Sequence, residues 1–150
     1  MLHSDIVLVV EVKNARGQTP VQFDILPSSG LPQSIVDSQF QLARQLAPSV
    51  GIAYYFLVTT DWVQGWSVAD GTAVFRERTS TLFAPYAPEG AAGIRSAGEY
   101  YLAELTQAWL SDLSTHWRSG RGHAPGEHAL HRSGVLPLVR SAATATTATA

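Results

Sequence analysis

The sequence of 150 residues contains no cysteine, so disulfide bonds and thiolate metal sites are excluded and a reducing compartment suits the chain. No run of about 18 apolar residues occurs, so we expect no transmembrane helix. The N-terminus lacks the basic region and the apolar run of a signal peptide. These absences predict a cytoplasmic protein without a membrane partner.

Charged residues are also scarce, at 15% of the chain against an average of about 25%. The net charge of −2 does not by itself indicate binding to nucleic acid or to an acidic membrane. The balance is uneven, because residues 1–117 carry six Arg or Lys and eleven Asp or Glu, whereas residues 118–150 carry four Arg and one Glu. The chain therefore divides into an acidic part and a short basic part.

The chain is long enough for one domain, which we place at residues 1–117. Residues 118–150 are expected to be a low-complexity, disordered tail, because the Ala-Thr repeats that end it cannot bury a core. Within this tail, His123, His128 and His131 could bind a metal. We favour a solvated segment, since no cysteine and no strong motif accompany them.

Two apolar segments, residues 5–13 and 53–60, predict strands that are buried on both faces. Between them, helical spacing of apolar residues predicts a helix from Ser34 to Ala47, which Pro48 ends. A helix between two such strands indicates a β–α–β crossover, which would make the strands parallel. A second helix is predicted over residues 98–117. The expected fold class is α/β: a small mixed β-sheet with a crossover helix and a C-terminal helix.

Two shorter features complete the expected sheet. Val21–Ile25 is expected to form a short edge strand. Asp70 and Gly71 favour a hairpin turn between residues 66–68 and 73–76.

Glu11 and Lys13 end the first predicted strand, and their side chains point to the same face because a strand alternates. A carboxylate can bind Mg²⁺, and a nearby ammonium group can orient water or neutralise a phosphate. The alternative is a structural ion pair at a strand end. A site is favoured by the apolar strand before the pair, by the loop after it, and by the placement of the only lysine of the chain there.

The pattern around this pair resembles the PD-(D/E)xK (restriction-endonuclease-like) nuclease superfamily over about residues 5–115. The residues that carry the resemblance are Leu8-Val9-Val10-Glu11-Val12-Lys13-Asn14, Gln39, Gln41, Arg44, Tyr54-Tyr55-Phe56-Leu57-Val58-Thr59-Thr60-Asp61, Trp66 and the helix from Glu104 to Leu113. The resemblance implies a restriction-endonuclease-like αβββαβ core, dependence on Mg²⁺ or Mn²⁺, and hydrolysis of phosphodiester bonds. It implies catalytic roles for Glu11, Lys13 and Gln41, with Gln39 as the alternative to Gln41.

The superfamily also needs an Asp, and Asp5 is the only acidic residue before Glu11. The resemblance therefore implies Glu11 and Asp5 as metal ligands. On one continuous strand, however, six residues at about 3.3 Å each separate the two by roughly 20 Å. The second ligand could instead be Asp24, Asp37 or Asp61, or the site could be inactive.

Two functions follow from the resemblance. The first is Mg²⁺-dependent phosphodiester hydrolysis, with nucleic acid as the partner and DNA favoured over RNA. The second is a catalytically inactive nuclease-like module for binding or dimerisation, in which an exposed sheet edge pairs with a second copy. A globular domain in which Glu11 and Lys13 are purely structural is the remaining interpretation.

Overall fold

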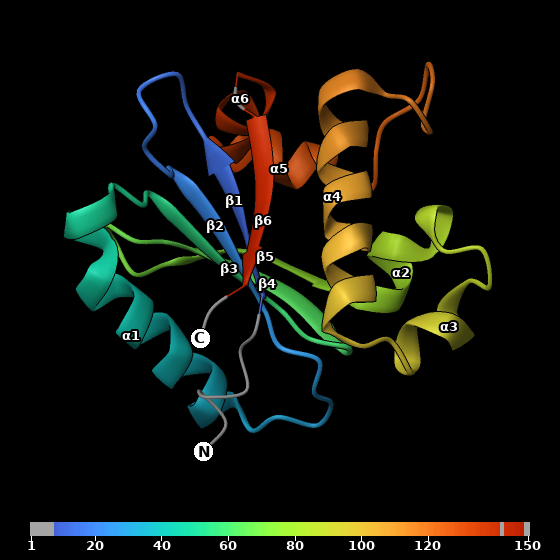
Figure 1. The fold of residues 1–150 in the computed structure, drawn as a ribbon, viewed down its shortest axis with the longest axis horizontal. Coiled ribbons are helices and arrows are strands. Elements are labelled where there is room, and N and C mark those ends of the chain that lie inside the picture. Colours follow the sequence, from blue (N-terminus) through green and yellow to red (C-terminus); the bar gives the residue numbers. More distant parts are fainter. Residues whose placement is uncertain (1–7, 142, 149–150) are drawn as a thin grey trace.

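The computed structural model of this protein describes residues 8–141 and 143–148. Within these residues, six strands form one sheet in the order β5-β4-β3-β2-β1-β6 (Figure 1). The strands are β1 (Leu8–Lys13), β2 (Val21–Ile25), β3 (Tyr54–Val58), β4 (Trp62–Ser67), β5 (Ala73–Arg78) and β6 (Ala143–Ala148). Only the β2–β3 pair is parallel among them, so the sheet is mixed.

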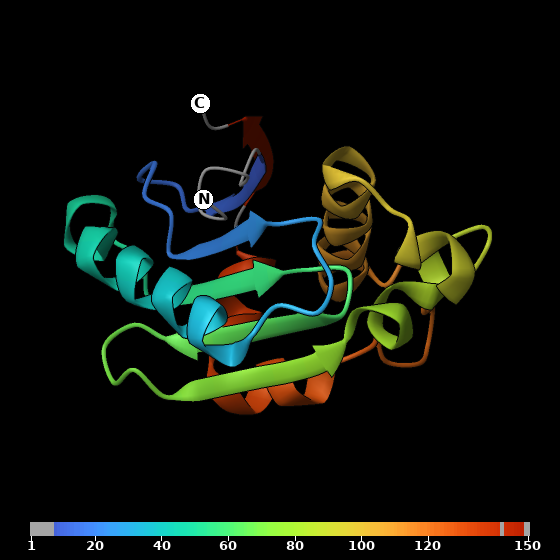
Figure 2. The ribbon, with the colours of Figure 1, turned by 90° about the horizontal axis from the view of Figure 1, so that it is seen from below.

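Helices cover both faces of the sheet (Figures 1 and 2). One face carries α1 (Gln33–Val50). The other carries α4 (Glu99–Thr115), with the shorter elements α2 (Thr79–Phe83), η2 (Ala84–Tyr86), α3 (Ala91–Arg95), α5 (Glu127–Ser133) and α6 (Val135–Arg140) beside it. This arrangement confirms the predicted α/β class. None of the helices among the described residues has the length and apolarity that spanning a bilayer requires.

The strand order corrects the predicted crossover. β1 pairs with β2 in an antiparallel hairpin, and α1 then links β2 to the parallel strand β3. The prediction that residues 5–13 and 53–60 are parallel was wrong, and Val21–Ile25 is an interior strand rather than an edge. The cause is the turn before β2: Gly17 has a φ of +78°, and the Asn14 side chain accepts the N–H groups of Arg16 and Gln18.

Two apolar clusters hold the layers together. On the α4 face, Trp109 is fully buried, and its ring lies 6.1 Å from that of Phe23. On the α1 face, Phe40 stacks on Trp66 at 5.0 Å, and Tyr55 lies beside both rings. Buried aromatic groups of this kind supply much of the apolar area that stabilises a small domain.

The end of α1 also differs from the prediction. The helix includes Pro48 and runs to Val50, after which Gly51 adopts a left-handed φ of +76° and donates its N–H to Ala47. Proline lacks the N–H of an interior helical residue, and here it stands in the last turn, with only Ser49 and Val50 of the helix after it. The left-handed glycine, rather than the proline, ends the helix.

The segment after residue 117 differs from the expected tail. Leu130, Val135, Leu136 and Val139 of α5 and α6 are buried in the cluster that α4 shares with the sheet. The Ala-Thr repeats form β6, which pairs with β1 over six residue pairs. These residues join the fold because the α4 face and the free edge of β1 give them apolar and backbone partners. β6 therefore occupies the edge of β1, and β5 and β6 are the two edge strands of the sheet that the described residues form.

Candidate functional site

Glu11 and Lys13 lie together on the α1 face of β1. Leu8, Val10 and Val12 point into the cluster on the α4 face, so the alternating residues face the other way. The Lys13 Nζ lies 3.7 Å from Glu11 Oε1. This proximity on one face agrees with the alternation predicted from the sequence.

Thr19 connects the two side chains. Lys13 Nζ donates to Thr19 Oγ1 at 3.1 Å, and Thr19 Oγ1 donates to Glu11 Oε2 at 3.4 Å. Thr19 is buried, whereas the side chains of Glu11 and Lys13 are 21% and 41% exposed. Thr19 therefore anchors the pair, whose side chains remain partly exposed to solvent.

β2 brings a second carboxylate to the same face. Glu11 pairs with Gln22 across the antiparallel ladder, and Asp24 lies two residues further along β2. Residues two apart on a strand share a face, so Asp24 is the diagonal neighbour of Glu11, at a typical separation of about 7 Å. Tyr55 donates its hydroxyl to Asp24 Oδ2 at 2.6 Å, and Gln22 Nε2 donates to Oδ1 at 2.9 Å.

Burial perturbs this carboxylate. Burial raises the pKa of Asp24 above its ordinary value, and the hydrogen bonds from Tyr55 and Gln22 offset only part of that rise. Burial and the neighbouring Asp24 charge raise the pKa of Tyr55 well above 10.0. Across the described residues, no Arg, Lys or His forms an ion pair with Asp24. Asp24 is thus a desolvated carboxylate without a cation.

The other predicted site residues lie elsewhere. Gln41 is exposed on α1, and its side chain makes no hydrogen bond or ion pair to another described residue, whereas Gln39 is buried. Asp37 is exposed and accepts a hydrogen bond from Gln33. Asp61 accepts the Gly30 N–H beyond the end of β3. Asp5 lies outside the described residues.

The donor set on this face fits Mg²⁺ in kind. The described residues contain no group of three or more His, Asp or Glu side chains placed to hold a metal. The α1 face of β1 and β2 offers two carboxylates, Glu11 and Asp24. Mg²⁺ commonly uses one or two protein carboxylates and takes its other ligands from water and substrate phosphates. A cation at this point would also relieve the desolvated charge of Asp24.

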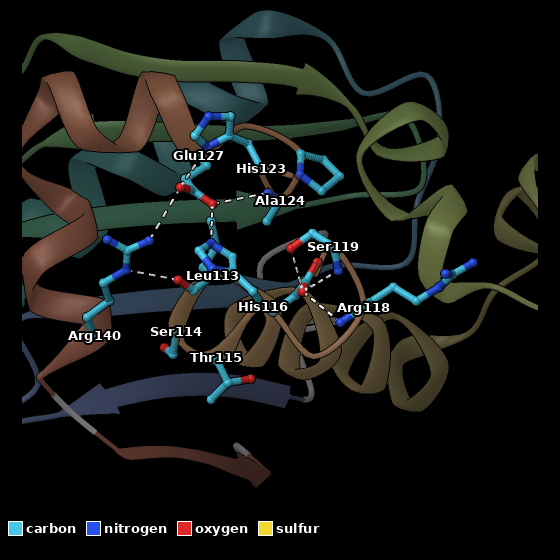
Figure 3. A network of polar contacts seen from close by, with 12 residues as sticks. Leu113, Ser114, Thr115, His116, Arg118, Ser119, His123, Ala124, Glu127 and Arg140 are labelled. Carbon is cyan, nitrogen blue, oxygen red and sulfur yellow. Dashed lines mark hydrogen bonds and ion pairs between the residues drawn. The ribbon is translucent and has the colours of Figure 1, made fainter. Parts of the chain in front are cut away.

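A second polar cluster surrounds Glu127 on the opposite side of the sheet (Figure 3). Its carboxylate contacts His116 Nε2 at 2.8 Å, His123 Nδ1 at 3.1 Å and Arg140 Nη2 at 3.4 Å, and it accepts the Ala124 N–H at 3.0 Å. Burial alone would raise the pKa of Glu127, but the hydrogen bonds from the two histidines and the Ala124 amide lower it to about 2. Glu127 therefore joins the end of α4 to α5 and α6.

Asp112 organises the loop that leads to this cluster. Its Oδ1 accepts the N–H groups of Arg118 and Ser119 and the Ser119 hydroxyl, each at 2.9 Å. Its Oδ2 accepts the Tyr86 hydroxyl at 2.6 Å. Burial acts to raise the pKa of Asp112, but these hydrogen bonds lower it overall. The buried carboxylate fixes the path of the chain after α4.

A cavity of about 490 Å³ adjoins Glu127. His123, His128, His131 and Arg140 line it, so the three tail histidines lie near one another. The described residues still provide no metal-binding group there. The sequence did not predict the Glu127 cluster because its partners come from the end of α4, the loop before α5, and α6. The only signal was a lone acidic residue among histidines.

Comparison with family models, with curated proteins and with solved structures found no match to this chain.

Proposed function

We propose that this protein is a Mg²⁺-dependent phosphodiesterase of the PD-(D/E)xK type that acts on nucleic acid, with Glu11, Asp24 and Lys13 as its site. One observation carries the proposal: Asp24 lies on the strand next to the Glu11–Lys13 strand, in antiparallel register and on the same face. In the superfamily, the Asp usually lies on the strand before the Glu-x-Lys strand. Here Asp24 lies on the strand after the Glu-x-Lys strand, and that strand is also its neighbour in the sheet.

Glu11 and Asp24 would hold the metal, which when bound would polarise the phosphodiester and favour a water nucleophile. Tyr55 and Gln22 hold Asp24 in place through both carboxylate oxygens. They are positioning residues, because outer hydrogen bonds orient metal ligands and tune their basicity.

Lys13 would orient the attacking water and offset charge on the phosphate. Its side chain is 41% exposed, and the ammonium group donates to Thr19 and lies 3.7 Å from Glu11 Oε1, so a further N–H donor is left for a substrate. Gln41 has no part in the proposed site, since its side chain is exposed on α1.

Cleavage of supercoiled plasmid and labelled single-stranded DNA and RNA, with Mg²⁺, Mn²⁺ or EDTA, tests this function. We expect metal-dependent cleavage that falls by at least about 100-fold in Glu11→Gln and in Lys13→Ala, a loss typical of removing one group that stabilises the transition state. Asp37→Asn is the matched control, because this carboxylate is exposed on α1. Equal cleavage in Glu11→Gln, Lys13→Ala and wild type would refute the site.

The second function, an inactive nuclease-like binding module, predicts a different result. The wild-type protein would then bind nucleic acid without cleaving it in either metal. The same samples therefore separate the two functions, because binding can be recorded in EDTA and cleavage after metal is added.

A further inference from the structure

Trp62 of β4 and Arg76 and Arg78 of β5 form a cluster at the β5 edge of the sheet. Arg78 pairs with Trp62 across the β4–β5 ladder, and Arg76 pairs with Gln64. The Arg76 guanidinium carbon lies 3.6 Å from the centroid of the Trp62 ring, and that of Arg78 lies 4.7 Å from it. Stacking on the ring restricts both guanidinium groups, which lowers the entropy lost when they bind a ligand.

Among the described residues, no carboxylate neutralises the charge of Arg76 or Arg78. Neither forms an ion pair with a carboxylate in the described residues, and both are exposed. Glu77 lies between them in sequence, so strand alternation places it on the opposite face. Two rigid, unpaired guanidinium groups side by side are suited to phosphate, which they can bind through bidentate hydrogen bonds.

A crevice of about 210 Å³ lies beside the cluster. Its lining includes Gly30 after β2, Thr59 and Asp61 after β3, Gln33 at the beginning of α1, and Trp62 and Arg76 of the cluster. It therefore lies outside the carboxyl ends of the two parallel strands, where open α/β sheets commonly bind ligands. Its one carboxylate, Asp61, accepts the Gly30 N–H at 2.6 Å.

The beginning of α1 adds to the positive character of this crevice. The helix has no side-chain cap at Pro32 and no acidic residue in its first turn. The free N–H groups there favour an anion, in addition to the two arginines.

We propose that Arg76 and Arg78, held over the ring of Trp62, bind the phosphodiester backbone of a nucleic-acid strand. The choice of nucleic acid rests on the proposed function. The crevice is smaller than the 300 Å³ or more typical of pockets that enclose a free small molecule, so it suits one unit of a longer chain. Arg76 and Arg78 contact the phosphate, whereas Trp62 is a positioning residue that acts through their guanidinium groups.

The cluster lies on the same face as the candidate catalytic site. Asp24, Leu57, Gln64 and Arg76 form one row across four strands. Three strand spacings of about 4.8 Å place Arg76 roughly 14 Å from Asp24 along the sheet. Because α1 covers the intervening β3, a strand contacting both points would pass around the beginning of that helix.

Binding of a fluorescent single-stranded DNA oligonucleotide, followed by anisotropy in EDTA across a salt series, tests the proposal without cleavage. We expect Arg76→Gln/Arg78→Gln to weaken binding by at least about tenfold at low salt. Losing two phosphate contacts should also reduce the slope of log K against log salt by about 1.4. Arg16→Gln/Arg95→Gln, which removes two exposed arginines elsewhere, is the control and should bind like wild type.

Trp62 has its own readout. Trp62→Leu should weaken binding with a smaller change in salt slope, because both charges remain, and Trp62→Tyr should restore most of the affinity. Thermal unfolding of each variant checks that it is folded. Wild-type binding that is absent, or unchanged in Arg76→Gln/Arg78→Gln, would overturn the proposal. Binding without metal-dependent cleavage would leave it standing and refute only the proposed catalysis.

Discussion

The hydroxyl of Tyr55 donates a 2.6 Å hydrogen bond to the carboxylate of Asp24, from β3 to the neighbouring strand β2. The ring of Tyr55 belongs to the aromatic cluster under α1, with Phe40 and Trp66. The apolar packing of α1 is thereby coupled to the position of the second carboxylate of the candidate site.

Replacing Tyr55 with Phe keeps the ring and removes this hydrogen bond. We expect the free energy of unfolding to fall by about 1–3 kcal/mol, as for the loss of one partner of a buried polar group. The pKa of Asp24 should rise further, because the Tyr55 hydrogen bond lowers it. Urea denaturation and carboxyl ¹³C NMR titration measure the two effects. Tyr100→Phe is the control, since Tyr100 is 68% exposed; equal losses in both variants would contradict the coupling.

Asp24 should make the protein less stable as the pH rises. Its folded pKa lies above the unfolded value of 3.8, so the folded state binds more protons between these two values. Relative to Asp24→Asn, wild-type stability should be highest below pH 3.8 and should decline as the pH rises through the folded pKa. Denaturation of both proteins over a pH series measures the difference. A difference independent of pH would mean that burial does not perturb Asp24.

Glu127 should have the opposite effect. Its folded pKa of about 2 lies below the unfolded value of 4.5, so its contribution is fully present above pH 4.5 and is lost as the pH falls toward 2. Glu127→Gln should therefore cost about 1–3 kcal/mol at neutral pH, through weaker hydrogen bonds to His116 and His123, and less in acid. Glu104→Gln, at an exposed position of α4, is the control. A cost that stays the same at pH 2.5 would contradict the assignment.

Gly65 permits close packing between β4 and the α4-face cluster. A Cβ atom there would lie 2.4 Å from the ring of Phe56, which stacks on Phe23 at 4.5 Å. Gly65→Ala should destabilise the protein by about 1–3 kcal/mol through overpacking. Adding Phe56→Leu should recover part of that loss. Gly98→Ala is the control because its Cβ meets nothing within 4 Å; calorimetry that finds equal effects at both glycines would refute the steric cause.

The placement of Glu11 and Lys13 could be predicted because strand alternation is a local property of the sequence. Asp24 could not be placed, because its position depends on the turn at Gly17 and on β2 entering the sheet beside β1. Because residues 21–25 were predicted to be an edge strand, the register that places Asp24 diagonally beside Glu11 was not expected. The sequence pattern indicated Asp5, because it is the only acidic residue before Glu11. The carboxylate on the neighbouring strand is instead Asp24, which comes after the turn.

The C-terminal region could not be predicted for a different reason. Its short apolar segments have weak helical spacing, and each is buried only because α4 and the sheet already offer a surface. The contacts that fix it are long-range, such as the 2.7 Å hydrogen bond from the Trp109 indole to the Pro125 carbonyl. Composition alone therefore indicated disorder where tertiary contacts impose helices.

The most direct test of the central claim, that Glu11 and Asp24 share one ion, is isothermal titration calorimetry with Mn²⁺ and Mg²⁺ at neutral pH. The claim predicts one site in wild type and in Asp37→Asn. Since even outer-shell changes cost 10–100-fold in metal affinity, Glu11→Gln and Asp24→Asn should each weaken binding by at least about tenfold. Equal affinity in all four proteins, or loss in Glu11→Gln alone, would contradict a shared ion.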